Sequence, residues 1–172
     1  MLRDAATHFD LVRAGVAIYG MDPFQRDPAD HGLEPALEVS SYVAEIKPIA
    51  PRESAGYGRR FVAEEPTTLA TVPIGYGDGV RRALTNNADV LVGGRRRPLR
   101  GTVSMDNVTV DLGPSPPGVN RGDDAVLIGA QGDERILAEE WARRLDTINY
   151  EIPCGLSRRV RRVYHRDGVP DA

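Results

Sequence analysis

Residues 67–79 read Thr-Thr-Leu-Ala-Thr-Val-Pro-Ile-Gly-Tyr-Gly-Asp-Gly, a strand-like run that leads into a glycine-rich segment. Its first part, residues 67–74, is mostly β-branched or apolar, which predicts a strand. Alternate glycines then surround Tyr76 and Asp78 and predict a sharp turn, with a short helix expected over residues 80–84. A strand, a glycine turn and a helix start often form the edge of a ligand site. Locally, an Asp-Gly turn with a surface tyrosine is the favoured interpretation.

On both sides of this stretch, the same β-branched and aromatic character returns in short runs separated by Gly, Pro or Asn-Asn turns. The runs cover residues 39–49, 89–92, 99–103, 108–112 and 125–128. Short strands at this spacing are typical of a β barrel or a β sandwich. The sequence therefore predicts a mainly β fold, a compact domain of barrel or sandwich type.

One helix interrupts this pattern. Leu137, Trp141, Leu145 and Ile148 recur at helical spacing, which predicts an amphipathic helix over residues 137–148. The polar positions between them are expected to face solvent; they are Glu139, Glu140, Arg143 and Arg144. The pair Glu140 and Arg144 has the favourable i,i+4 order.

The first 34 residues differ from the rest. Residues 11–19 are mostly apolar and short, which predicts a buried strand or the end of a core element. Residues 21–35 contain Pro23, Pro28, Gly32 and Pro35 among charges, as a linker does. We therefore expect a fragment of another domain over residues 1–34, followed by the β domain over residues 35–172.

The composition excludes several classes of protein. The chain has 172 residues, with 22 basic and 25 acidic side chains and a formal net charge of −3, so it has no global attraction to nucleic acid. It contains no apolar run of the roughly 20 residues that span a bilayer, and the first ten residues do not resemble a signal peptide. A cytoplasmic location with no membrane partner is the default expectation. Cys154 is the sole cysteine and the three histidines are far apart, so no metal site is expected.

The basic residues are distributed unevenly. Lys47 is the single lysine, and the other basic residues are arginines. Residues 95–97 follow Gly93 and Gly94 and are expected at an exposed hairpin tip. Residues 158–162 are expected to form a strand with a solvated basic face. Few aromatic residues lie among these arginines, which argues against nucleic-acid binding.

Three further patches mix glycine, aromatic and charged residues. In Gly56-Tyr57-Gly58 the glycines let the backbone turn sharply and present the tyrosine. Residues 104–107, Ser-Met-Asp-Asn, lie between two predicted strands, and residues 147–151, Thr-Ile-Asn-Tyr-Glu, end the predicted helix. Each patch could line a pocket, but for each alone a turn or plain packing is the favoured interpretation.

Taken in order, the patches resemble one family. They are residues 13–20 (Arg-Ala-Gly-Val-Ala-Ile-Tyr-Gly), 54–58 (Ser-Ala-Gly-Tyr-Gly), 73–79 (Pro-Ile-Gly-Tyr-Gly-Asp-Gly), 101–106 (Gly-Thr-Val-Ser-Met-Asp) and 147–152 (Thr-Ile-Asn-Tyr-Glu-Ile). Together they resemble the C-terminal half of alanine racemase in order and spacing, and the resemblance runs from about residue 10 to residue 161.

The resemblance implies a homodimer of two-domain subunits, each an α/β barrel that holds pyridoxal phosphate on a lysine, followed by a β domain. Residues 1–34 would then be a remnant of the end of the barrel. The activity implied is interconversion of L- and D-alanine, which supplies D-alanine for peptidoglycan. Two bases act on opposite faces of the substrate, one of them a tyrosine from the β domain of the other subunit.

By position, that tyrosine is Tyr57. Tyr76, Met105 and Asp106 match residues that bind the substrate or line the way to it. Four further residues match positions that hold the cofactor, through its ring nitrogen or its phosphate; they are Arg13, Gly15, Val16 and Tyr150.

The chain departs from the family in lacking the cofactor lysine and its barrel motif. Lys47 is no substitute, because it lies at the end of a predicted strand and far from the motif in order. The chain alone is therefore expected neither to racemise alanine nor to hold the cofactor, and its expected partners are alanine and either a second copy or the missing barrel domain. Two alternatives stay open: a racemase of another amino acid, and a non-catalytic β-barrel binding or assembly module.

Overall fold

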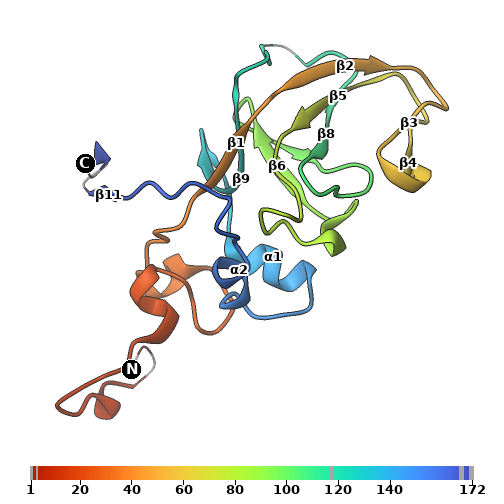
Figure 1. Cartoon of the computed structure of the whole chain (residues 1–172). Helices are drawn as coiled ribbons and strands as arrows, with labels where there is room; N and C mark the ends of the chain where they lie inside the picture. Colours follow the sequence, from red (N-terminus) through yellow and green to blue (C-terminus); the bar gives the residue numbers. More distant parts are fainter. Residues whose placement is uncertain (1, 3, 117, 167–168, 171–172) are drawn as a thin grey trace.

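The structure is a computed structural model, and it describes residues 2, 4–116, 118–166 and 169–170. Two antiparallel sheets form its centre (Figure 1). The larger sheet has the order β1-β9-β6-β7, with β10 paired to β9. Its strands are β1 (Val39–Tyr42), β6 (Asp89–Val92), β7 (Arg95–Pro98), β9 (Asp124–Gln131) and β10 (Glu134–Ile136).

The smaller sheet has the order β2-β5-β8. It consists of β2 (Glu45–Ile49), β5 (Thr67–Val72) and β8 (Val108–Gly113). Two short antiparallel pairs lie outside the sheets: β3 (Ser54–Ala55) with β4 (Phe61–Val62), and β11 (His165–Arg166) with β12 (Val169–Pro170).

The two sheets are joined at two corners. The chain passes from β1 to β2 at Val43 and Ala44, whose N–H groups donate to the carbonyls of Asp123, just before β9, and of Thr71 in β5. The second link is an isolated bridge between Leu99 and Val110. These links join the two sheets. The architecture is mainly β, as the sequence predicts.

One apolar core fills the space between the sheets. The inward side chains of β8, Val108, Val110 and Leu112, alternate with half-exposed residues, as a strand with one buried face requires. They pack in the same cluster as the fully buried residues of β6 and β9. Because residues from both sheets share this cluster, the two sheets form one unit.

Two short α-helices lie beneath the sheets in Figure 1, between them and the N-terminal segment. Helix α1 (Ala138–Arg144) buries Trp141, and α2 (Glu151–Cys154) buries Ile152. The remaining helices are 3-10 turns: η1 (Ala5–Thr7), η2 (Gly15–Tyr19), η3 (Pro28–His31), η4 (Tyr57–Arg59) and η5 (Arg82–Leu84).

The expected strand over residues 11–19 is absent. A 3-10 helix, η2, takes its place, with Gly15 at φ +60° at its start and Gly20 at φ +73° after its end. These left-handed positions bend the chain at both ends, so it cannot stay extended. Val16 is buried in the main core, whereas Leu11 and Ile18 are 74% and 73% exposed. The N-terminal segment therefore presents apolar surface to solvent.

Two expectations for the middle of the chain were wrong. Residues 95–97 form β7, paired with β6, and only Gly93 and Gly94 make the hairpin turn. Because β7 begins directly after this turn, it is β7 that pairs with β6. The strand expected over residues 99–103 does not form, and these residues contribute only the bridge at Leu99.

Three further expectations also need correction. Helix α1 ends at Arg144, leaving Ile148 51% exposed. The expected helix over 80–84 is only the 3-10 turn η5. Residues 158–162 form turns and irregular chain instead of a strand.

A cluster of buried polar groups attaches the expected linker to the two α-helices. Glu139, expected on the solvent face, is 1% exposed. Its Oε1 accepts from the Asp22 N–H and from Nδ2 of Asn149, both at 2.8 Å. Asp22 and Asn149 are themselves fully buried. Because these donors need an acceptor inside the protein, they draw Glu139 inward despite its charge.

Candidate active site

Tyr57 lies at the tip of the β3–β4 hairpin, and its side chain points into solvent. The residue is 73% exposed. Gly56 and Gly58 flank it at φ +73° and +70°, a left-handed conformation that L side chains rarely adopt. The two glycines thus allow the tight 3-10 turn η4, which presents the phenol.

The turn that carries Tyr57 is fixed to the loop of residues 101–107. Oγ1 of the buried Thr102 donates a hydrogen bond of 2.7 Å to the carbonyl oxygen of Tyr57. On the other side, Gly101 N–H donates to Oδ1 of Asn86, whose Nδ2 donates to the Arg60 carbonyl. Asn86 therefore ties the same loop to the chain just after the turn.

Tyr76 and Met105 are held together by their backbones. Tyr76 N–H donates to the Ser104 carbonyl and Gly77 N–H to the Met105 carbonyl, both at 2.9 Å. At Gly75, a Cβ atom would lie 2.3 Å from the Ser104 oxygen, so only glycine permits this approach. Tyr76 and Met105 are 45% and 50% exposed.

The loops of residues 56–60, 75–79 and 101–107 thus meet through direct hydrogen bonds. They carry Tyr57, Tyr76 and Met105, which stand well exposed at the surface. The Met105 N–H has no acceptor within the described part of the chain. An exposed phenol can exchange a proton with a bound acid, and a backbone N–H without an acceptor can hold a carboxylate.

Asp106 is already engaged by a neighbour. Arg159 donates to its Oδ1 at 2.5 Å, and the Nε of the same arginine lies 3.2 Å from Oδ1 of Asp78. The Asp106 hydrogen bond and the charge of Asp78 hold the pKa of Arg159 above its usual value. Asp106, which follows Met105 in the chain, is therefore bound in an ion pair with Arg159.

Gly15 and Tyr150 come together in a second place. A Cβ on Gly15 would lie 3.7 Å from the Tyr150 hydroxyl, although 135 residues separate them. Among the residues described, this hydroxyl has no hydrogen-bond partner. Val16, next to Gly15, is buried, while Arg13 is exposed and has no ion-pair partner within the described ranges.

The segment after α2 links these two places. Ser157 N–H donates to the Asp78 carbonyl at 2.9 Å, and a Cβ on Gly79 would lie 2.6 Å from the Gly155 oxygen. The loop that carries Tyr76 therefore rests on the chain that follows Tyr150 and α2.

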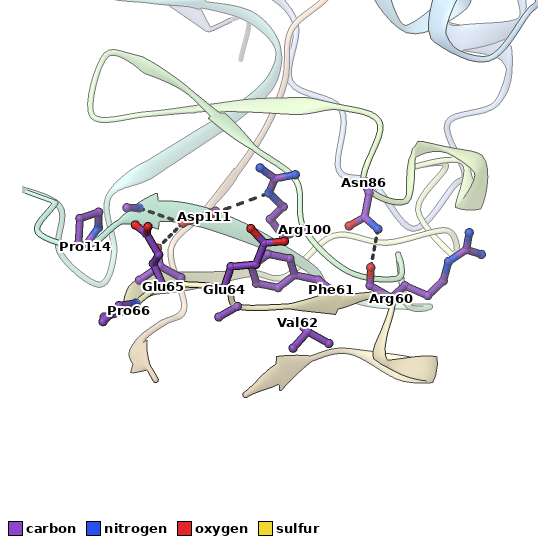
Figure 2. A pocket seen from close by; sticks show the side chains of 13 residues that line it. Arg60, Phe61, Val62, Glu64, Glu65, Pro66, Asn86, Arg100, Asp111 and Pro114 are labelled. Atoms are coloured by element: carbon purple, nitrogen blue, oxygen red, sulfur yellow. Dashed lines mark hydrogen bonds and ion pairs between the residues drawn. The ribbon is translucent and has the colours of Figure 1, made fainter. Parts of the chain in front are cut away.

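A hollow of about 680 Å³ lies against β4, β5 and β8 and borders the site only at Arg60 and Asn86 (Figure 2). Arg100 stacks over Phe61 there at 5.7 Å and lies 3.8 Å from Asp111. Its lining includes both cations and carboxylates, namely Arg60, Arg100, Glu64, Glu65 and Asp111. None of the site residues expected from the sequence lines it.

The described residues hold no group of three His, Cys, Asp or Glu side chains that could bind a metal ion. No helix in the same residues is long and apolar enough to cross a membrane.

Sequence reasoning missed two residues that shape the site. Thr102 lies inside one of the motifs, but its bond to Tyr57 spans 45 residues. Arg159 belongs to the arginine cluster of residues 158–162, for which the sequence indicates only a solvated basic face. Its partner Asp106 lies 53 residues away. Only the fold brings these pairs together.

The described chain is thus a mainly β domain that presents an exposed tyrosine on a glycine turn, and in a separate place the Tyr150 hydroxyl faces Gly15. The family model for the C-terminal domain of alanine racemase matches residues 36–164. The chain belongs to the alanine racemase family, as its C-terminal part.

Named relatives agree. Alanine racemase from Thermobifida fusca is 47% identical over 156 residues, which cover 91% of this chain and 41% of the relative. The Mycolicibacterium vanbaalenii enzyme is 45% identical, covering 91% and 40%. This chain therefore spans about 40% of the length of these curated relatives.

Solved structures agree in shape. Alanine racemase from a D-cycloserine-producing Streptomyces lavendulae superposes with a TM-score of 0.88 at 40% identity, covering 96% of this chain and 43% of that one. The Bacillus anthracis enzyme with bound L-Ala-P gives 0.82 at 39% identity, covering 91% and 40%.

Proposed function

We propose that this chain is the C-terminal part of a pyridoxal-phosphate-dependent alanine racemase and supplies Tyr57 as one of its two acid–base groups. The observation that carries the proposal is the position of Tyr57, which is 73% exposed on a turn bonded through Thr102 to the loop of Met105. Residues 1–34 would be the end of the cofactor-binding barrel, and residues 35–172 the β domain.

Racemisation requires that a proton leave Cα on one face and return on the other, so one acid–base group is needed on each face. In the proposal the Tyr57 oxygen takes or gives the proton on one face, while the free N–H of Met105 holds the substrate carboxylate. Tyr76 and Asp106 border the same space. A lysine amine serves the other face. Lys47 cannot be that group, because it is exposed on β2, which carries none of the proposed site residues.

The residues near Gly15 fit a phosphate ester. The Tyr150 hydroxyl faces Gly15 with no partner in the described ranges, and glycine leaves the space between them open. In addition, the first N–H groups of a helix find no acceptor within it, and Gly15 and Val16 begin η2. We propose that Gly15, Val16 and Tyr150 hold the cofactor phosphate and Arg13 its ring nitrogen. When bound, pyridoxal phosphate stabilises negative charge that develops at the substrate Cα.

The proposal includes the setting of the reaction. The active unit would be a homodimer in which Tyr57 serves the barrel of the other subunit. It would be cytoplasmic and supply D-alanine for peptidoglycan. The exposed apolar side chains of Phe9, Leu11 and Ile18 support a partner on the N-terminal segment.

A chimera tests the proposal. The corresponding C-terminal part of the Thermobifida fusca relative is replaced by this chain, and conversion of L-alanine, L-serine and L-lysine to their D-enantiomers is measured. We expect racemisation with alanine preferred, and none from this chain alone. A folded, cofactor-loaded chimera that prefers another amino acid, or that racemises none, would refute the proposal.

A further inference from the structure

Arg159 joins the two loops that carry the proposed substrate contacts. It lies in the segment after α2 and reaches Asp106 in one loop and Asp78 in the other. The Asp106 contact is 2.5 Å and the Asp78 contact is 3.2 Å. Asp106 follows Met105 directly, and Asp78 lies two residues after Tyr76.

The guanidinium lies close against the backbone between these two carboxylates. A Cβ on Gly77 would lie 2.3 Å from Nη1 of Arg159. Asp78 is also held from within its own loop, since its Oδ2 accepts from the Gly75 N–H at 2.9 Å. The Asp78 carbonyl accepts from Ser157, which anchors the arginine's own segment to the same loop. The ion pair between Arg159 and Asp78 is therefore stabilised from both partners: Asp78 is fixed within its own loop, and the segment of Arg159 is bonded to that loop.

The charges explain why an arginine suits this place. Asp78 and Asp106 carry like charges on adjoining loops, which would drive the loops apart without a cation between them. Guanidinium presents five donors in a planar fork and can bind two carboxylates at once, which an ammonium does poorly. The hydrogen bond that Arg159 donates to Asp106 and the charge of Asp78 raise the pKa of Arg159, so the cation persists at any working pH.

From this arrangement we infer that Arg159 is a positioning residue, which sets the spacing of Tyr76 and Met105 by binding Asp78 and Asp106 together. The inference rests on the proposed function only for its catalytic consequence. The Met105 N–H would contact the substrate carboxylate, and that contact tightens binding only if the loop is already in place. Loss of the arginine then weakens substrate binding more than it slows proton transfer at Tyr57.

Two measurements test the inference separately. Hydrogen exchange on this chain follows the amides of residues 75–79 and 103–107 in wild type, Arg159→Gln, Arg159→Lys and Arg158→Gln. Steady-state kinetics on the chimera gives KM and kcat for alanine in the same variants. Arg158→Gln is the matched control, because Arg158 is exposed and has no partner among the described side chains.

In Arg159→Gln we expect exchange at both loops to rise about 10-fold, and KM to rise about 5- to 10-fold with kcat within about 3-fold of wild type. Arg159→Lys keeps one ion pair and should fall in between. Wild-type exchange and KM in both Arg159 variants, or an equal change in Arg158→Gln, would overturn the inference. If Arg159→Gln does not fold, Arg159→Lys decides. An inactive wild-type chimera refutes the proposed function instead, and the exchange data still decide whether Arg159 holds the loops.

Discussion

The hydroxyl of Thr102 donates a hydrogen bond of 2.7 Å to the carbonyl oxygen of Tyr57. Thr102 is buried while Tyr57 is 73% exposed, so a residue packed in the interior holds an exposed turn. The bond ties the proposed base to the loop that carries Met105. The position of the phenol thus depends on a buried residue of another loop.

Replacing Thr102 tests that dependence. Thr102→Val removes the donor and keeps the shape of the side chain, so we expect a loss of about 1 kcal/mol in unfolding free energy. In the chimera, kcat for alanine should fall about 10-fold because Tyr57 loses its fixed position. Thr102→Ser keeps the hydroxyl and is the control. Equal kcat values for the two variants would show that the bond does not position Tyr57.

Gly75 offers a test of the contact between the loops. In Gly75→Ala the new methyl would lie 2.3 Å from the Ser104 oxygen, so the loops must separate, and we expect about 2–3 kcal/mol of destabilisation in urea unfolding. Gly94→Ala is the control. A methyl there meets nothing within 4 Å, and its cost of about 1 kcal/mol comes from the left-handed backbone alone. A smaller loss for Gly75→Ala than for the control would contradict the close approach.

Much of the fold could be predicted from local pattern. The run at residues 89–92 became β6, and the run at 125–128 lies inside β9 (Asp124–Gln131). The expected pair of Glu140 and Arg144 forms at 3.0 Å. These features depend on neighbours in sequence or on a buried face, both of which the residues themselves specify.

The rest depends on contacts between distant residues. The burial of Glu139 follows from donors at Asp22 and Asn149, which are 117 and 10 residues away in the chain. Its charge alone therefore gave the wrong prediction that it faces solvent. The strand expected over residues 11–19 is bent into η2, because its glycines adopt left-handed conformations that apolar character does not reveal. The functional roles of the site residues expected from the resemblance remain predictions.

The buried polar cluster predicts a large loss of stability. Glu139→Leu leaves the Asp22 N–H and the Asn149 amide without their acceptor in the core, and we expect about 3 kcal/mol lower unfolding free energy. Glu139→Gln keeps the accepting Oε1 and should lose less. Glu64→Leu, at an exposed position without a partner in the described chain, should change stability by less than about 0.5 kcal/mol. Similar losses for Glu139→Leu and Glu64→Leu would contradict the account.

Glu140 predicts how stability depends on pH. Burial raises its pKa, but the hydrogen bond and charge of Arg96, with Arg144, more than offset this and bring it below the usual 4.5. A lowered carboxyl pKa stabilises the fold above the unfolded value of 4.5, and that stabilisation is lost as pH falls through the folded value.

Arg96→Met should therefore cost about 1 kcal/mol at pH 7, since these charges are partly exposed, and progressively less below pH 4.5. Urea unfolding from pH 3 to 7 measures the difference. Arg95→Met, which removes an exposed arginine without a partner in the described residues, is the control. A difference between Arg96→Met and wild type that stays constant over this range would exclude the assigned cause.

The most direct measurement is made on Tyr57→Phe in the chimera, with racemisation and Cα–H exchange in D2O followed for each enantiomer of alanine. If Tyr57 is the acid–base group on one face, racemisation falls by about 10³-fold and exchange is lost for one enantiomer while it persists for the other. Racemisation at the wild-type rate, with both enantiomers exchanging as before, would contradict the account.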